Sequence, residues 1–181
     1  MRWAVFLRGV NVGGHRVTKD ELIAACADAG LPGATTFLAS GNIVVDAPEA
    51  PAATEADLIA RIERAMQARL GYAVPTLLRP GIELAGLAVN AFFTPQQLET
   101  GAKPQLILLP EIPEPAALAE LMEASPAEDL LVPDGRSIGW LPREGVSTSE
   151  LDLTAIGRAI GPITVRTFNT IERMRAKFFE A

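Results

Sequence analysis

The residues best suited to chemistry lie in a glycine-rich stretch near the N-terminus. The run LRGVNVGG at residues 7–14 is followed by His15 and Arg16, and the triplet Ser40-Gly41-Asn42 comes further along the chain. Glycines let backbone amides approach a ligand closely, and guanidinium, hydroxyl and amide groups bind phosphate or carboxylate oxygens. The pattern therefore predicts a site for a small anionic ligand. Its candidate residues are Arg8, Asn11, Gly13, Gly14, Arg16, Ser40 and Asn42.

The same residues also have a purely structural interpretation. Gly9, Gly13 and Gly14 would permit positive φ in a tight crossover, and Asn11 and Asn42 would hydrogen-bond within their own turns. The spacing Gly-x-x-x-Gly-Gly matches neither the dinucleotide fingerprint nor the phosphate loop of nucleoside triphosphatases. We therefore expect no nucleotide cofactor.

Two single residues, a histidine and a cysteine, are candidates for reactive groups. His15 has the side chain best suited to proton transfer near neutral pH, but no nucleophile or orienting carboxylate is placed beside it, so enzymatic activity stays open. Cys26 falls with Leu22 and Ala29 on one face of a helix, which favours a small core residue. One cysteine and one histidine cannot form an internal disulfide or a common zinc set, so no metal is expected.

A second polar cluster is predicted near the C-terminus, with Ser149, Arg166, Asn169 and Thr170 as its residues. Ordinary helix capping is the alternative. Ser149 with Asp152 has the spacing of a capping box, and Asn169 or Thr170 can cap a last helix.

The elements that must position these groups follow from hydrophobic periodicity and from helix start and stop signals. The first half predicts strands at 3–7, 35–39, 43–46 and 74–79 and helices at 18–30 and 54–70. Thr18 with Glu21 and Thr54 with Asp57 have capping-box spacing. After a connecting helix or turn across 82–93, the second half predicts strands at 105–109, 130–132, 137–141 and 163–166, helices at 115–123 and 149–160, and a final helix from about Thr170.

Both halves thus have the order β-α-β-β-α-β, which predicts four antiparallel strands backed by two helices. The predicted fold class is α+β, with two consecutive ferredoxin-like (α-β plait) subdomains plus a C-terminal helix. We expect an N-terminal subdomain at 1–80, a connecting segment at 81–103 and a C-terminal subdomain with the terminal helix at 104–181. In this topology the first strand ends where the third begins, so loop 8–17 and turn 40–42 should share one rim of the sheet.

Composition and charge restrict the function classes. The 181 residues are 49% hydrophobic, with no apolar run near the ~18 residues needed to span a bilayer. We expect a soluble, cytoplasmic protein without a membrane partner. The net charge of −6 argues against a protein that wraps nucleic acid. The acidic residues are concentrated in 111–134, which contains no Lys or Arg.

The run LRGVNVGG at 7–14, together with SGNIV at 40–44, resembles a widespread bacterial family catalogued as domain of unknown function 1697. The similarity extends to Ser149-x-Leu151 and to the run RTFNT at 166–170. The family usually has Lys at the position of Glu150, Asn at that of Leu153 and an Asn-Trp pair at 167–168. The resemblance implies a pair of α-β plaits and brings no established activity.

Three functions follow as hypotheses. The best supported is binding of a small anionic metabolite at loop 8–16 and turn 40–42. A protein-interaction or homo-oligomerisation module is the alternative, based on the acidic stretch 111–134. Single-stranded RNA binding is disfavoured, because such plaits stack bases on exposed aromatic residues of the central strands and only Trp140 is available.

Overall fold

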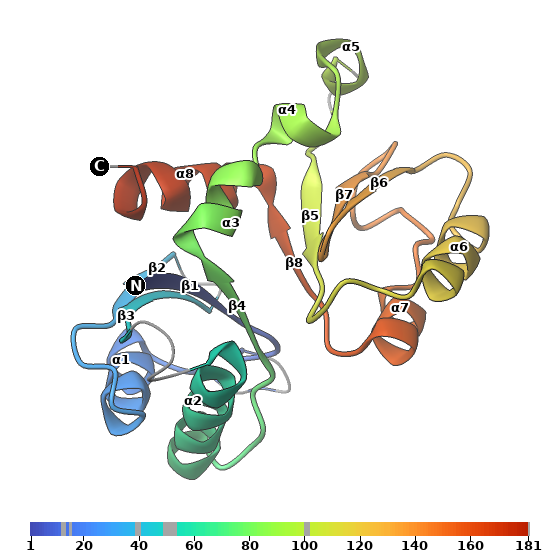
Figure 1. The fold of residues 1–181 in the computed structure, drawn as a ribbon. Coiled ribbons are helices and arrows are strands. Elements are labelled where there is room, and N and C mark those ends of the chain that lie inside the picture. Colours follow the sequence, from blue (N-terminus) through green and yellow to red (C-terminus); the bar gives the residue numbers. More distant parts are fainter. Residues whose placement is uncertain (12–13, 15, 39–40, 49–53, 100–101, 181) are drawn as a thin grey trace. The chain divides into compact units, whose positions relative to one another are not determined.

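The computed structural model shows a mixed α+β chain with two four-stranded antiparallel sheets and a C-terminal helix (Figure 1). It describes residues 1–11, 14, 16–38, 41–48, 54–99 and 102–180. By their internal contacts these residues form two compact units. Unit 1 is Met1–Ala85 with Met174–Ala181, and unit 2 is Gly86–Arg173.

Unit 1 contains the first sheet and its helices. Their bounds are β1 (Arg2–Leu7), α1 (Lys19–Asp28), β2 (Thr35–Phe37), β3 (Asn42–Asp46), α2 (Glu55–Leu70), β4 (Thr76–Pro80) and α3 (Gly81–Gly86). The strand order is β2-β3-β1-β4, and Val5 of β1 lies opposite Ile43 of β3 and Leu78 of β4. The predicted β-α-β-β-α-β order is present, with strand ends shifted by one or two residues.

The helices of unit 1 begin at the predicted caps. The Thr18 hydroxyl accepts a hydrogen bond from the Glu21 amide while the Glu21 carboxylate accepts from the Thr18 amide, and Thr54 and Asp57 form the same capping box at α2. These hydrogen bonds hold the pKa of Glu21 below its usual value. Gly71 ends α2 at φ 83°, a left-handed conformation that glycine adopts without strain.

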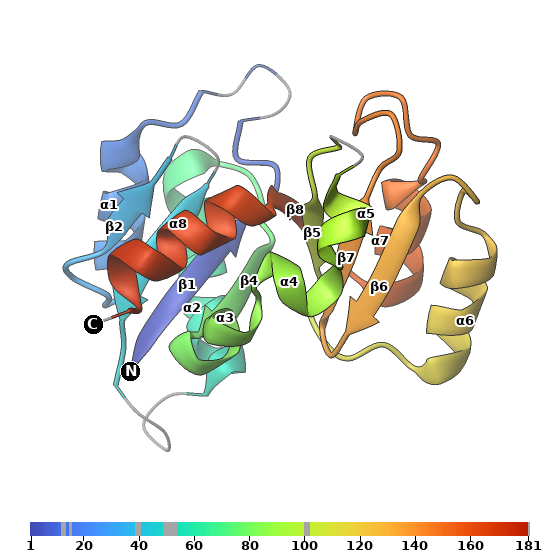
Figure 2. The same ribbon diagram turned by 90° about the horizontal axis from the view of Figure 1, so that it is seen from above.

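The core of unit 1 lies between one sheet face and the helices α1 and α2, which cover that face in Figures 1 and 2. Leu58, Ile62 and Met66 of α2 are completely buried there. Val5 of β1 and Ile43 and Val45 of β3 pack in the same core. Val44 lies on the other sheet face, because side chains alternate along a strand.

Cys26 is completely buried in this core, and burial raises the pKa of its thiol to about 12. Because the thiolate is the reactive form, native protein at pH 8 should react with a disulfide reagent such as DTNB far more slowly than a model thiol. Denaturant should restore the rate. A native rate near that of free cysteine would contradict the burial of Cys26.

The opposite face of this sheet is also covered. Phe6, Phe37, Asn42 and Leu77 share that face by strand register, and each is buried. The ring of Phe178, near the C-terminus, meets the Phe37 ring edge-on with centroids 5.7 Å apart. The C-terminal end of helix α8 (Phe168–Phe178) therefore lies on the face opposite α1 and α2 (Figure 1).

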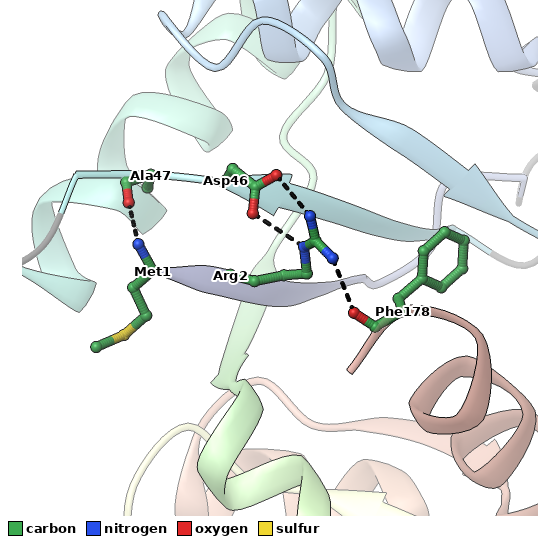
Figure 3. Close-up of polar contacts among 5 residues, drawn as sticks. All are labelled: Met1, Arg2, Asp46, Ala47 and Phe178. Atoms are coloured by element: carbon green, nitrogen blue, oxygen red, sulfur yellow. Dashed lines mark hydrogen bonds and ion pairs between the residues drawn. The ribbon is translucent and has the colours of Figure 1, made fainter. Parts of the chain in front are cut away.

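Polar contacts hold the same terminal segment to β1 (Figure 3). The Arg2 guanidinium donates to both Asp46 oxygens at 2.9 and 3.0 Å and to the Phe178 carbonyl at 3.0 Å. The ion pair lowers the pKa of Asp46.

The expected second domain, 104–181, includes the whole terminal helix, whereas from Met174 onward this helix packs with unit 1. The physical reason is that the second face of the first sheet is apolar and must be buried against another element.

Unit 2 contains the second sheet. Its elements are α4 (Val89–Phe92), α5 (Pro95–Leu98), β5 (Gln105–Leu108), α6 (Pro115–Glu123), β6 (Leu130–Asp134), β7 (Ser137–Leu141), α7 (Leu153–Ile160), β8 (Thr164–Thr167) and the start of α8. The strand order is β6-β7-β5-β8, and the core lies against α6 and α7. Helix α6 has its predicted bounds.

Helix α7 begins four residues later than predicted. Asp152, not Ser149, is its N-cap, and the Asp152 carboxylate accepts hydrogen bonds from the amides of Thr154 and Ala155, both at 2.9 Å. Asp152 directly precedes Leu153, the first residue of the helix, and aspartate caps a helix as well as serine does. No helix among the described residues is long and apolar enough to cross a membrane.

Candidate functional site

A hollow of about 450 Å³ lies beside the edge strand β2 of unit 1, and we call it the N-terminal hollow. It joins the glycine-rich loop, the start of α1 and the end of β2. Its lining residues are Asn11, Arg16, Val17, Lys19, Leu22, Thr36 and Leu38. Two of the predicted ligand residues, Asn11 and Arg16, therefore lie on one concave surface.

Hydrogen bonds fix both ends of the loop that forms this hollow. The Asn11 side-chain oxygen accepts from the Val17 amide at 3.0 Å, and the Tyr72 hydroxyl donates to the Val10 carbonyl at 2.7 Å. At the rim, the Leu7 amide donates to the Gly41 carbonyl at 2.8 Å. The end of β1 and the turn before β3 thus meet, as the topology predicts.

The charge in the hollow comes from side chains. Arg16 and Lys19 are exposed cations, and none of the described lining residues is acidic. The N-terminus of α1 contributes less than that of an uncapped helix, because the capping box occupies the amide of Glu21 and places the Glu21 carboxylate in the first turn. An anion here would be bound mainly by the two cationic side chains.

The floor and mouth of the hollow are apolar. Leu22 is buried beneath it and Val17 is half-buried. Leu38 is 46% exposed at φ 56°, a backbone conformation uncommon for a residue other than glycine. The arrangement suits a ligand with an anionic group and an apolar body.

The other predicted ligand residues are placed differently. Arg8 is exposed and does not line the hollow, and Gly14 is exposed at φ 85°. Asn42 is completely buried and donates from Nδ2 to the Phe37 carbonyl at 3.1 Å, which closes the β2–β3 turn. Gly13, Ser40 and also His15 lie outside the described residues.

The second predicted cluster contains separate local contacts. Thr170 pairs with Thr167, whose hydroxyl also accepts from the Thr170 amide at 3.1 Å, and Asn169 is exposed. Arg166 donates to the Thr164 hydroxyl and to the Val165 carbonyl, and burial lowers the pKa of its guanidinium to about 10.

Ser149 makes its contacts apart from Arg166, Asn169 and Thr170. Its hydroxyl donates to Asp129, which also accepts from the Trp140 indole at 2.8 Å. Trp140 and Val165 pack in the α6–α7 core, so Arg166, next to Val165 on β8, lies on the other sheet face. The sheet therefore separates Arg166 from Ser149.

Asp129 is the structurally important residue that the sequence reasoning missed. Its carboxylate gathers three donors, the Trp140 indole, the Ser149 hydroxyl and the Arg143 amide at 3.2 Å. It lines a hollow of about 260 Å³ that also includes Glu128 and Glu144. Asp129 is one of several acids in 111–134, and no sequence signal distinguishes it. Among the described residues, no group of three His, Cys, Asp or Glu side chains is placed to hold a metal.

Leu7 and Val10 of the LRGVNVGG run lie beside Gly41 of the SGNIV run at the rim of the first sheet. A sequence profile described as "Protein of unknown function (DUF1697)" matches residues 1–138. The chain belongs to the DUF1697 family. The profile ends before Ser149, so the C-terminal motif of this DUF1697 chain is outside the matched region.

A solved structure resembles the whole DUF1697 chain. It is described as the conserved bacterial protein SP0830 from Streptococcus pneumoniae, with a TM-score of 0.76 and 18% sequence identity. The alignment covers 99% of this chain and 98% of that one. At this identity the similarity shows a shared fold. No curated protein sequence matches the chain.

Proposed function

We propose that the N-terminal hollow binds a small ligand with one anionic group and an apolar body. The observation that carries this proposal is the convergence of Arg16, Lys19 and Asn11 over an apolar floor. The volume of about 450 Å³ lies within the range typical of small-molecule sites, roughly 300–1,000 Å³. Carboxylates and phosphate monoesters are the ligand classes that suit two cations on one wall.

The RNA-binding alternative is not favoured by the position of Trp140. This indole is 1% exposed and hydrogen-bonded to Asp129, so it offers no surface for base stacking. In unit 1, strand β3 offers no aromatic substitute, because its central residues are aliphatic.

We also propose that the two units are ferredoxin-like subdomains related by duplication. Both have the same element order and the same relative strand order. A buried arginine occupies the matching position of each fourth strand, Arg79 opposite Ala4 and Arg166 opposite Leu106. The shared placement supports an origin from one repeated β-α-β-β-α-β unit.

The ligand proposal is tested by thermal shift. Inorganic phosphate, pyrophosphate, short-chain fatty acids and aromatic carboxylates serve as probes. We expect at least one to raise the Tm of the native protein, and Arg16→Ala and Lys19→Ala each to weaken its binding by about tenfold or more. The reason is that a hydrogen bond to a charged group contributes about 1.5–3 kcal/mol.

Arg64→Ala is the matched control, since Arg64 is an exposed arginine of α2 that does not line the hollow. It should retain the full shift. Two results would reject the proposal: no probe stabilises the native protein, or the stabilisation survives in both hollow variants.

A further inference from the structure

A second concave surface lies in unit 2, between α6 and α7, and we call it the α6–α7 groove. It has a volume of about 180 Å³. Leu121 and Ile156 form its floor at 8% and 5% exposure, and four alanines form its walls. These are Ala117, Ala124, Ala155 and Ala159. A cavity of about 150 Å³ accommodates benzene, so this groove has room for one or two apolar side chains.

The walls would allow another backbone to approach closely. Ala155 and Ala159 are one helical turn apart and therefore lie on the same face of α7. Methyl side chains leave a shallow channel between the two helices, into which the side-chain ridge of a third helix fits. Ala124, Ala155 and Ala159 are exposed, so the described residues leave this channel open.

The charged residues around the groove determine which partner is electrostatically complementary to it. Glu120 and Asp152 are its charged lining residues, and both are exposed. Helix α6 lies within 111–134, the stretch that contains seven acidic residues (Glu111, Glu114, Glu120, Glu123, Glu128, Asp129 and Asp134) and no Lys or Arg. An occupant with flanking cations is complementary, whereas a second copy of this chain brings a net charge of −6.

We propose that the α6–α7 groove docks an amphipathic helix of a partner protein. Apolar side chains of that helix, spaced at i and i+3 or i+4, would enter between the alanines, and its Lys or Arg residues would face Glu120 and Asp152. This surface belongs to unit 2 and is independent of the ligand proposed for unit 1.

The test uses a fluorescent amphipathic helical peptide of leucine and lysine, measured by anisotropy with the full-length protein. Ala155→Phe should fill the groove and weaken binding by at least about tenfold. Its matched control is Ala119→Phe, an exposed alanine of α6 outside the groove, which should stay within about twofold of the wild type. The same peptide with glutamate replacing lysine should not bind.

The charge contribution is tested separately. Glu120→Gln should weaken binding up to about fivefold, less so at high salt, while Glu123→Gln, outside the groove, should have a smaller effect. Arg16→Ala should leave peptide binding unchanged, so this experiment is independent of the ligand test.

Three results would overturn the proposal. One is equal weakening by Ala155→Phe and Ala119→Phe, and another is equal binding of the glutamate peptide. The third is a dimer at micromolar concentration that Ala155→Phe dissociates, since a second copy would then be the occupant.

Discussion

Removal of residues 174–181 is expected to destabilise unit 1 by at least about 2–5 kcal/mol, the range for losing one fully buried methionine. Met174 is completely buried, and the truncation also removes the Phe178 ring from Phe37 and the Phe178 carbonyl from Arg2. The apolar second face of the first sheet would lose a cover. Cys26 reports the effect directly, because it reacts only when unit 1 opens, and its labelling rate should rise at least about thirtyfold.

A shorter truncation is the control for this experiment. Removing only residues 180–181 eliminates the ion pair between Glu180 and Arg175, in which Glu180 is 55% exposed. Exposed pairs contribute about 0–1 kcal/mol, so Cys26 should stay protected. Equal protection of Cys26 after both truncations would show that the terminal segment does not stabilise unit 1.

Gly139→Ala is expected to destabilise unit 2 by about 1–3 kcal/mol, with a Tm lower by roughly 5–20 °C. A Cβ atom at this β7 position would lie 2.7 Å from Cδ1 and 2.9 Å from Cβ and Cγ of Phe92. Phe92 cannot move aside easily, since its ring packs against Phe168 and Phe93 with centroids 5.2 and 6.4 Å away. Trp140 fluorescence and calorimetry would measure the loss.

Gly86→Ala is the matched control, the same chemical change at a glycine of α3 with nothing within 4 Å of the new atom. Its effect should be neutral or slightly stabilising, because alanine reduces the entropy of the unfolded chain. A double-mutant cycle adds a second check: Phe92→Leu should cost less in the Gly139→Ala background than alone. Equal stability losses for the two glycine variants would contradict the packing of Phe92 on Gly139.

The order and approximate bounds of the elements were predictable because their signals are local. Thr18 with Glu21 and Thr54 with Asp57 set the starts of α1 and α2, and periodicity placed the faces of α2 that are buried. The start of α7 was missed because Ser149 and Asp152 both fit a cap, and only the contact with Asp129 shows where Ser149 is used. The cover of the second sheet face was missed because periodicity does not identify which sheet a helix will cover.

The candidate site was predictable only in part, for a related reason. Topology correctly brought the end of β1 to the turn before β3, as the bond between Leu7 and Gly41 shows. It could not separate Asn42, which holds that turn from a buried position, from Asn11, which lines a hollow. Lys19 and Leu38 were missed because neither has a residue type or spacing that indicates a site.

The discontinuity of unit 1 has a consequence for synthesis on the ribosome. Unit 2 is continuous in sequence, whereas the segment that begins at Met174 emerges only after all of unit 2. At about 5–20 residues per second, the delay after Ala85 is on the order of ten seconds, longer than most small domains need to fold. The nascent first sheet therefore waits without the Phe178 ring on Phe37. An uncovered apolar sheet face is prone to aggregation, and a chaperone would shield it until this segment emerges.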